Sequence, residues 1–189
     1  TSTQIFGAPI EVAVDRGTPE SRESRIPLLM MKAEPIIREH AGDEGIFRLS
    51  GGHDKIQYWK RQFDLGEDPN LQEEVDIHVI TGLLKLYLRE LPEYLLTAKL
   101  APNFEAVKRI DNPHVQAMYI KSLVEQLPEV NYCALYWLLS LLWDIIANKE
   151  TNFMGVENLA LIFSPTLKCS VNVIQILLQD FEVIFGMAE

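Results

Sequence analysis

The sequence predicts an all-α protein, a single-domain bundle of about eight to nine helices. Along most of the chain apolar residues recur at intervals of three and four, the repeat of one face of an α-helix. Proline and glycine separate these stretches, and no alternating pattern typical of strands competes with them. A chain of 189 residues fits one domain and is long enough to bury a sizeable core.

The first 25 residues form the least regular part of the sequence. They carry Gly7, Pro9, Gly17 and Pro19 among scattered charges and show no helical stripe of apolar residues. We therefore expect an irregular N-terminal segment over residues 1–25 that packs on a helical domain over residues 26–189.

The helices can be followed in order. A first helix is expected over residues 27–40, kinked or restarted at Pro35, which lacks a backbone donor. A second is expected over residues 53–64, and Asp76 can cap a third that stops at Pro92. Further helices are expected at about residues 103–110, 113–127, 131–147, 154–163 and 172–185.

Charge and composition limit the partners. The net charge of −10 opposes binding to nucleic acid and to anionic membranes. The most apolar stretch, residues 134–147, contains Asp144 and is shorter than the roughly 20 residues that span a bilayer, so it should be a buried core helix. With only Cys133 and Cys169, the chain suits the reducing cytosol. We expect a cytoplasmic, monomeric domain of a larger protein, without membrane insertion of its own, which regions outside this segment could bring to membranes.

A search for catalytic motifs finds little. The four histidines are dispersed, so no metal site is predicted. Neither G-x-x-x-x-G-K-[ST] nor G-x-G-x-x-G occurs, and Ser50 lacks the glycine context of a hydrolase nucleophile. We therefore predict neither a cofactor nor a complete active site of the domain's own.

One loop stands apart. Four glycines fall within the eleven residues 42–52, and Gly45 and Gly51 bracket Arg48. Glycine permits a tight turn, and such a turn would expose the long, positively charged side chain of Arg48. Alternatively, Arg48 is structural and caps a helix C-terminus or pairs with Asp43 or Glu44.

Four motifs carry a resemblance. Residues 6–9 (FGAP), 45–51 (GIFRLSG), 83–92 (LLKLYLRELP) and 158–167 (NLALIFSPTL) together resemble the RhoGAP family. The resemblance covers nearly the whole chain and implies an all-helical domain that activates Rho, Rac and related small GTPases. The partner would be a GTP-bound Rho/Rac-family protein, which supplies GTP and Mg²⁺ itself.

The resemblance also implies residue roles. Arg48 resembles the arginine finger that completes the partner's active site, so the domain would be a GTPase activator without being an enzyme itself. Lys85 and Asn158 resemble residues that contact the partner. The residues expected to support the loop are Arg89, Gly45, Gly51 and Pro165. The chain departs from the family pattern at three positions outside the proposed catalytic set, Tyr94, Ser164 and Pro35.

Each role has an alternative from the residues alone. Lys85 and Arg89 lie four residues apart, on one helix face, and could form a solvated basic strip. Asn158 could make only a local hydrogen bond near a helix start. At the level of function, the alternatives are a domain that docks GTPases without accelerating hydrolysis and a helical enzyme with its own active site.

Overall fold

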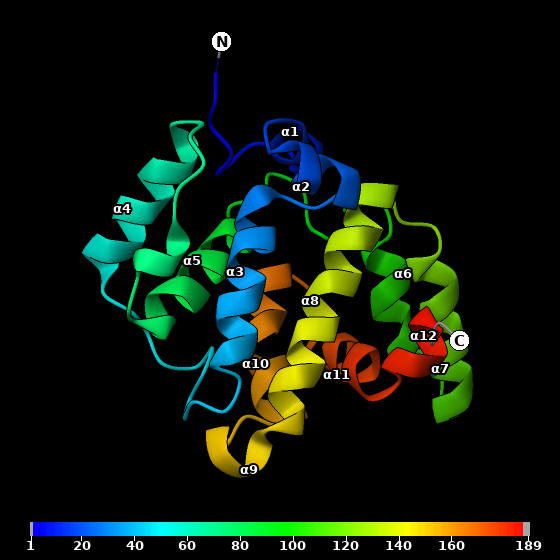
Figure 1. Cartoon of the computed structure of the whole chain (residues 1–189). Coiled ribbons are helices and arrows are strands. Elements are labelled where there is room, and N and C mark those ends of the chain that lie inside the picture. Colours follow the sequence, from blue (N-terminus) through cyan, green and yellow to red (C-terminus); the bar gives the residue numbers. More distant parts are fainter. Residues whose placement is uncertain (1, 187–189) are drawn as a thin grey trace.

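The computed structural model describes residues 2–186, and this part of the chain is built from helices without a strand (Figure 1). The elements in chain order are α1 (Ile10–Asp15), α2 (Pro19–Ser24), α3 (Leu28–Glu39), α4 (His53–Asp64), η1 (Leu71–Glu73), α5 (Ile77–Arg89), α6 (Ala101–Glu105), η2 (Ala106–Arg109), α7 (Pro113–Val124), α8 (Glu129–Ala147), α9 (Lys149–Asn152), α10 (Val156–Leu167), α11 (Val171–Gln179) and α12 (Phe181–Phe185). The predicted all-α class is confirmed. Residues 1 and 187–189, at the ends of the predicted segments, lie outside the described part.

The N-terminal segment contains two short helices, α1 and α2, so the expectation of an irregular stretch was wrong from residue 10 onward, while residues 2–9 are irregular. Pro9 directly precedes α1 and Pro19 occupies the first turn of α2, where the missing amide hydrogen costs no helical bond. The Thr18 hydroxyl caps α2 by accepting from the Ser21 amide. These prolines mark the starts of helices, although the sequence analysis interpreted them as breaks. The segment packs on the rest of the domain through Ile10 and other buried apolar residues.

The next three helices follow the prediction closely. α3 continues through Pro35 as one element, without the restart that we considered. α4 covers the predicted residues 53–64, and α5 begins after Asp76, whose side chain accepts from the His78 amide. α5 packs against both α3 and α4.

The second half contains more, shorter elements than expected. The stretch 103–110 is divided into α6 and η2, and the last predicted helix breaks at Asp180 into α11 and α12. α10 runs past the predicted end through Pro165, which lies in its last turn. The twelve α-helices within residues 2–186 exceed the eight to nine predicted because several span only four to six residues.

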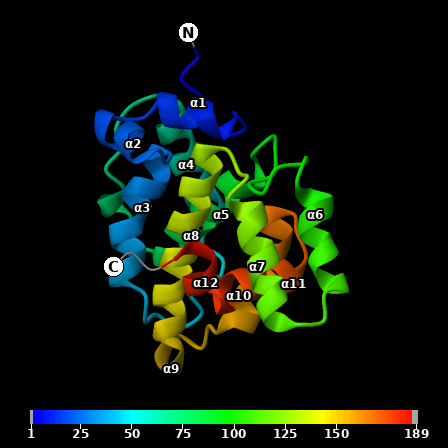
Figure 2. The same cartoon turned by 90° about the vertical axis from the view of Figure 1, so that its right-hand side faces the viewer.

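α8 is the central helix of the core. Its 19 residues are apolar and long enough to cross a membrane by length and composition alone. Leu135, Leu138 and Leu142 are nevertheless fully buried, and the helix packs against α1, α3 and α11 (Figures 1 and 2). It is therefore the buried core helix that the sequence predicted.

The connection between α3 and α4 lies at one end of the molecule. In Figure 1 it descends at the lower left toward α9, and its Phe47 packs on Phe163 of α10. α10 also packs on α5, so this connection is flanked by α5, α9 and α10. The two motif-bearing helices are thereby brought beside the glycine-rich loop.

Candidate functional site

The Arg48 loop, residues 45–51, begins with a tight turn. Gly45 has a φ of 70°, a conformation that favours glycine, and its carbonyl oxygen accepts from the amides of both Arg48 and Leu49 at 2.8 Å. A Cβ atom at Gly45 would lie 2.7 Å from Cγ of Leu49. The turn therefore favours glycine, and the Arg48 side chain reaches back over it, with Nη2 3.2 Å from where that Cβ atom would lie.

Phe47 anchors the loop in the core. It is fully buried although its φ is 72°, and its ring meets that of Phe163 on α10 with the centroids 5.4 Å apart. Its carbonyl oxygen accepts a hydrogen bond from Nζ of Lys85 on α5 at 2.5 Å. The residue next to Arg48 is thus tied to two different helices.

Gly51 anchors the other end of the loop. A Cβ atom at this position would lie 2.5 Å from the amide nitrogen of Val79 and 2.6 Å from the carbonyl carbon of His78. These are backbone atoms of the first turn of α5, so the loop can approach the helix only where a side chain is absent. The expected supporting role of Gly45 and Gly51 is consistent with both positions.

Arg48 itself is exposed. Within residues 2–186 its guanidinium makes no ion pair or hydrogen bond, because Asp43 pairs instead with Nδ1 of His40 at 2.9 Å and Glu44 is turned to solvent. The alternative of an arginine paired with Asp43 or Glu44 is therefore not what the structure shows. The guanidinium is thus exposed and unpaired within the described part of the chain, on a loop that is itself anchored.

Lys85 and Arg89 lie on α5 but have different surroundings. Lys85 is half-buried, and its pKa lies below the usual value because burial disfavours the charge, with repulsion from Arg89 as a smaller cause. Arg89 is exposed, and within the described residues its side chain has no hydrogen bond, while its carbonyl oxygen accepts from Lys168 at 2.8 Å. In this structure Lys85 makes the loop contact that the resemblance assigned to Arg89.

α10, whose buried Phe163 packs on Phe47 of the loop, also has an exposed face. Asn158, Leu161 and Pro165 follow each other at intervals of three and four, so they share one side of the helix. Asn158 is exposed, and its Oδ1 accepts at 3.4 Å from the amide of Gly155, so the local capping that we considered is present. Leu161, which the sequence reasoning did not single out, leaves 64% of its surface exposed. In the sequence, Leu161 looks like the buried leucines of the same helix. Only the packing of the helices shows that it is exposed while they are buried.

Asn152 was also missed. It is fully buried at the end of α9, and its main-chain oxygen accepts from the Gly45 amide at 2.9 Å. A single asparagine at a helix end carries no signal of burial in the sequence.

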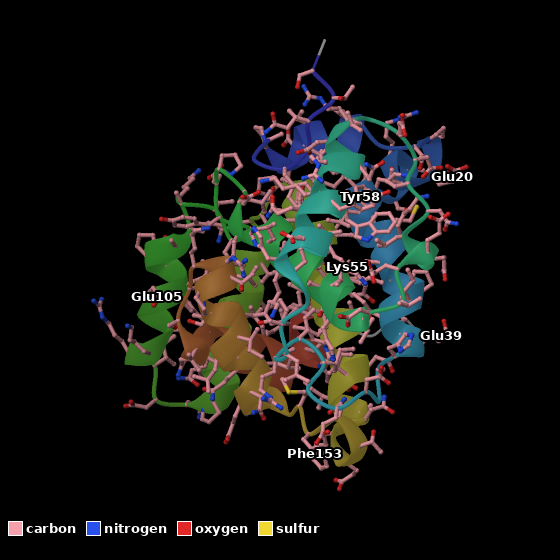
Figure 3. All side chains as sticks on the ribbon, turned by 90° about the vertical axis from the view of Figure 1, so that its left-hand side faces the viewer. Glu20, Glu39, Lys55, Tyr58, Glu105 and Phe153 are labelled. Carbon is pink, nitrogen blue, oxygen red and sulfur yellow. The ribbon has the colours of Figure 1, made fainter. Side chains whose placement is uncertain are left out.

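Figure 3 shows the neighbourhood of the Arg48 loop, with the α3–α4 connection running below Lys55 of α4 toward Phe153.

The assembled site can do little chemistry alone. Its parts are an unpaired guanidinium, a half-buried lysine behind the loop and an exposed helix face with an amide and apolar side chains. A guanidinium binds phosphate oxygens through a planar fork of donors. The arrangement suits the presentation of a cation to an anionic group held by another molecule.

Comparisons with known proteins agree on one family. A family model described as RhoGAP domain matches residues 27–170. The Rho GTPase-activating protein gacJJ of Dictyostelium discoideum is 38% identical over 193 residues, with 98% of this chain and 21% of the relative covered. Rho GTPase-activating protein gacZ of the same organism is 38% identical, with 97% and 18% covered. The chain therefore corresponds to about a fifth of the length of these relatives.

Solved structures give the same result. The crystal structure of human Rho GTPase activating protein 15 superposes with a TM-score of 0.89 at 27% identity, with 97% of this chain and 93% of that chain covered. The BH domain from GRAF, the GTPase regulator associated with focal adhesion kinase, superposes with a TM-score of 0.78 at 28% identity, covering 85% and 94%.

Proposed function

The chain belongs to the RhoGAP domain family, and from this premise we propose that it stimulates GTP hydrolysis by a Rho-family small GTPase, Rho or Rac in type, with Arg48 as an arginine finger inserted in trans. The observation that carries the proposal is the exposed, unpaired Arg48 on a loop anchored at both of its ends. The names of the relatives support the activity.

The chemistry follows from what a small GTPase lacks. The GTPase holds GTP, Mg²⁺ and the attacking water, but charge that develops on the phosphate oxygens is poorly stabilised in the isolated site. A guanidinium stays protonated and can bind two oxygens at once. In a site from which the complex excludes water, a finger of this kind accelerates hydrolysis by about 10³–10⁵, which is roughly 4–7 kcal/mol of barrier.

The loop serves this chemistry by holding Arg48 in place before the partner arrives. Phe47 is fixed by Phe163 and Lys85, so little backbone freedom is lost when the complex forms. The remaining freedom is that of the Arg48 side chain. Lys85 in this proposal orients the loop and contacts the partner, and Arg89 steadies the loop once the complex has formed.

The partner would rest on the exposed face of α10. Within residues 2–186 the Asn158 side chain is engaged through its oxygen alone, so its amide nitrogen can bond to a partner, and Leu161 offers apolar surface beside it. Pro165 extends the same face. An apolar patch with a polar group beside an unpaired cation has the composition of a contact surface.

Single-turnover hydrolysis with a GTP-loaded Rho-family protein tests the proposal. Arg48→Ala should remove most of the stimulation, about 10³-fold or more, while binding to the GTPase loaded with a non-hydrolysable GTP analogue stays within a few-fold. A matched control is Arg109→Ala, which removes an exposed arginine at the end of η2 and should change neither quantity.

Two results would contradict the proposal. Near-normal stimulation by Arg48→Ala would refute the finger assignment. Binding of the unaltered domain without any acceleration would instead indicate a docking module.

A further inference from the structure

We propose that Asn152 is a positioning residue, which sets the rate of the stimulated reaction by fixing the Arg48 loop while touching neither Arg48 nor the partner. The inference rests on the proposed function and adds a residue to it. It is carried by the hydrogen bonds of one buried side chain.

Asn152 bonds to four separate segments, to three of them through its side chain and to one through its main chain. Its Nδ2 atom donates to the carbonyl oxygens of Ala41 and Ile145, both at 2.7 Å, and its Oδ1 atom accepts from the Met154 amide at 2.7 Å. Its main-chain oxygen accepts from the amide of Gly45 at 2.9 Å. One residue therefore joins the end of α3, the end of α8, the entry to α10 and the first residue of the Arg48 loop.

This arrangement links the two halves of the site. Gly45 begins the turn that presents Arg48, and its carbonyl oxygen accepts from the Arg48 amide. Met154 leads into α10, which carries Asn158. The distance between the cation and the helix face that would receive the partner is thus set in part by Asn152.

The side chain has no substitute in its surroundings. It is fully buried, and both amide hydrogens and the oxygen are used. Without it, the carbonyl oxygen of Ala41 and the Met154 amide would lose this partner away from water, which is unfavourable, while the carbonyl oxygen of Ile145 would keep only the bond from the Asn148 amide at 3.0 Å. The loop and the entry to α10 are the segments free to move.

Small displacements matter for a finger. A misplacement of about 1 Å in a catalytic group can lower the rate by about 10²-fold. We therefore expect a change at Asn152 to lower the maximal rate of stimulated hydrolysis by tenfold or more. The domain concentration that gives half of the maximal rate should stay within about threefold of that of the unaltered domain, because the exposed face of α10 remains.

Two variants and one control separate positioning from general destabilisation. Asn152→Asp keeps the shape but replaces the donor of two hydrogen bonds with an oxygen, and Asn152→Ala removes the group. The control is Asn131→Asp at the opposite end of α8, where a similarly buried asparagine, 7% exposed, donates to the carbonyl oxygen of Leu95 at 2.9 Å. All are compared by single-turnover hydrolysis at saturating domain, at a temperature where circular dichroism shows each to be folded.

A double variant identifies the route of the effect. If Asn152 acts through Arg48, the pair Asn152→Ala with Arg48→Ala should be no slower than Arg48→Ala alone. Equal further losses in both backgrounds would show a role unrelated to the finger and would overturn the inference. So would Asn152 variants that fold and keep the unaltered maximal rate.

Hydrogen exchange of the unaltered domain gives a test that needs no variant. The Gly45 amide should be protected as strongly as amides within α8, because it donates to a buried oxygen. Fast exchange at Gly45 would contradict the inference even if no Asn152 variant folds. An unaltered domain that stimulates no GTPase would instead sink the proposed function, and the inference with it.

Discussion

Phe47 has a backbone conformation that few phenylalanines adopt. A φ of 72° costs a non-glycine residue of order 1 kcal/mol, and such residues persist only where their surroundings hold them. Here the ring packs on Phe163 and the carbonyl oxygen accepts from Lys85. The backbone strain lies directly beside Arg48, which is the residue whose direction it determines.

Lys85→Met tests whether this hold has a catalytic effect. Methionine keeps the apolar stem but leaves the Phe47 carbonyl oxygen without its charged donor, a bond worth about 1.5 kcal/mol or more. We expect the maximal rate of stimulated hydrolysis to fall about tenfold, besides any weakening of partner binding. The measurement is single-turnover hydrolysis across a range of domain concentrations.

The control for this change is Lys99→Met, in the connection between α5 and α6. The Lys99 side chain is exposed and makes no hydrogen bond or ion pair in the described residues, so its loss should leave both the loop and the rate unchanged. If Lys85→Met changed only the domain concentration at half-saturation and not the maximal rate, Lys85 would act in partner binding and not in positioning the loop.

At the scale of single residues, the sequence suggested a candidate residue, Arg48, but not the contacts that hold its loop. Arg48 could be singled out because glycines surround it and because its neighbours resemble a family motif. The bond between Lys85 and Phe47 spans 38 residues and that between Asn152 and Ala41 spans 111. These contacts depend on how the helices pack against one another, and a local sequence pattern does not predict that packing.

Among the elements, α5 has the largest share in building the site. Its first turn borders Gly51, its middle carries Lys85, and its length packs on α3, α4 and α10. The sequence predicted this helix well because both of its ends carry signals, the Asp76 cap and Pro92. α1 and α2 were missed because proline serves equally as a break and as a helix start.

The approach of the loop to α5 predicts a contrast between adjacent glycines. Gly51→Ser should lower the free energy of unfolding by about 1–3 kcal/mol and slow stimulated hydrolysis, because its Cβ atom would meet backbone atoms of His78 and Val79. Gly52→Ser should be neutral or slightly stabilising, since Gly52 has open space and caps α4. Denaturant unfolding and single-turnover assays of both variants would decide, and equal behaviour would contradict the close approach.

At the scale of the whole molecule, two buried side-chain atoms within residues 2–186 have no hydrogen-bond partner, Nδ1 of His78 and the hydroxyl of Tyr87. The Tyr87 hydroxyl is buried on α5 and has no hydrogen bond within residues 2–186, while its ring meets that of Phe6 edge-on at 5.4 Å. Burial raises the pKa of this phenol above its usual value. The ring thus stabilises the packing of the N-terminal segment, while the hydroxyl weakens the core.

Tyr87→Phe should therefore stabilise the protein. At pH 7 we expect the free energy of unfolding to rise by about 1 kcal/mol, because an unsatisfied buried hydroxyl is removed and the contact with Phe6 is kept. Above about pH 10 the unfolded chain releases the Tyr87 proton while the folded chain retains it. The unaltered protein should then lose about 1.4 kcal/mol more per pH unit than the variant.

Denaturant unfolding at pH 7 and at several alkaline values would measure this difference. Tyr58→Phe, at an exposed tyrosine of α4, is the matched control and should change neither the stability nor its slope with pH. A less stable Tyr87→Phe variant would show that the hydroxyl has a partner after all.

The free guanidinium of Arg48 has a consequence for control of the domain. Because no carboxylate within residues 2–186 holds it, no ion pair inside this part of the chain has to break before the proposed finger can enter a partner's site. Under the proposed function, silencing the domain would then mean covering this end of the molecule or keeping it away from its target.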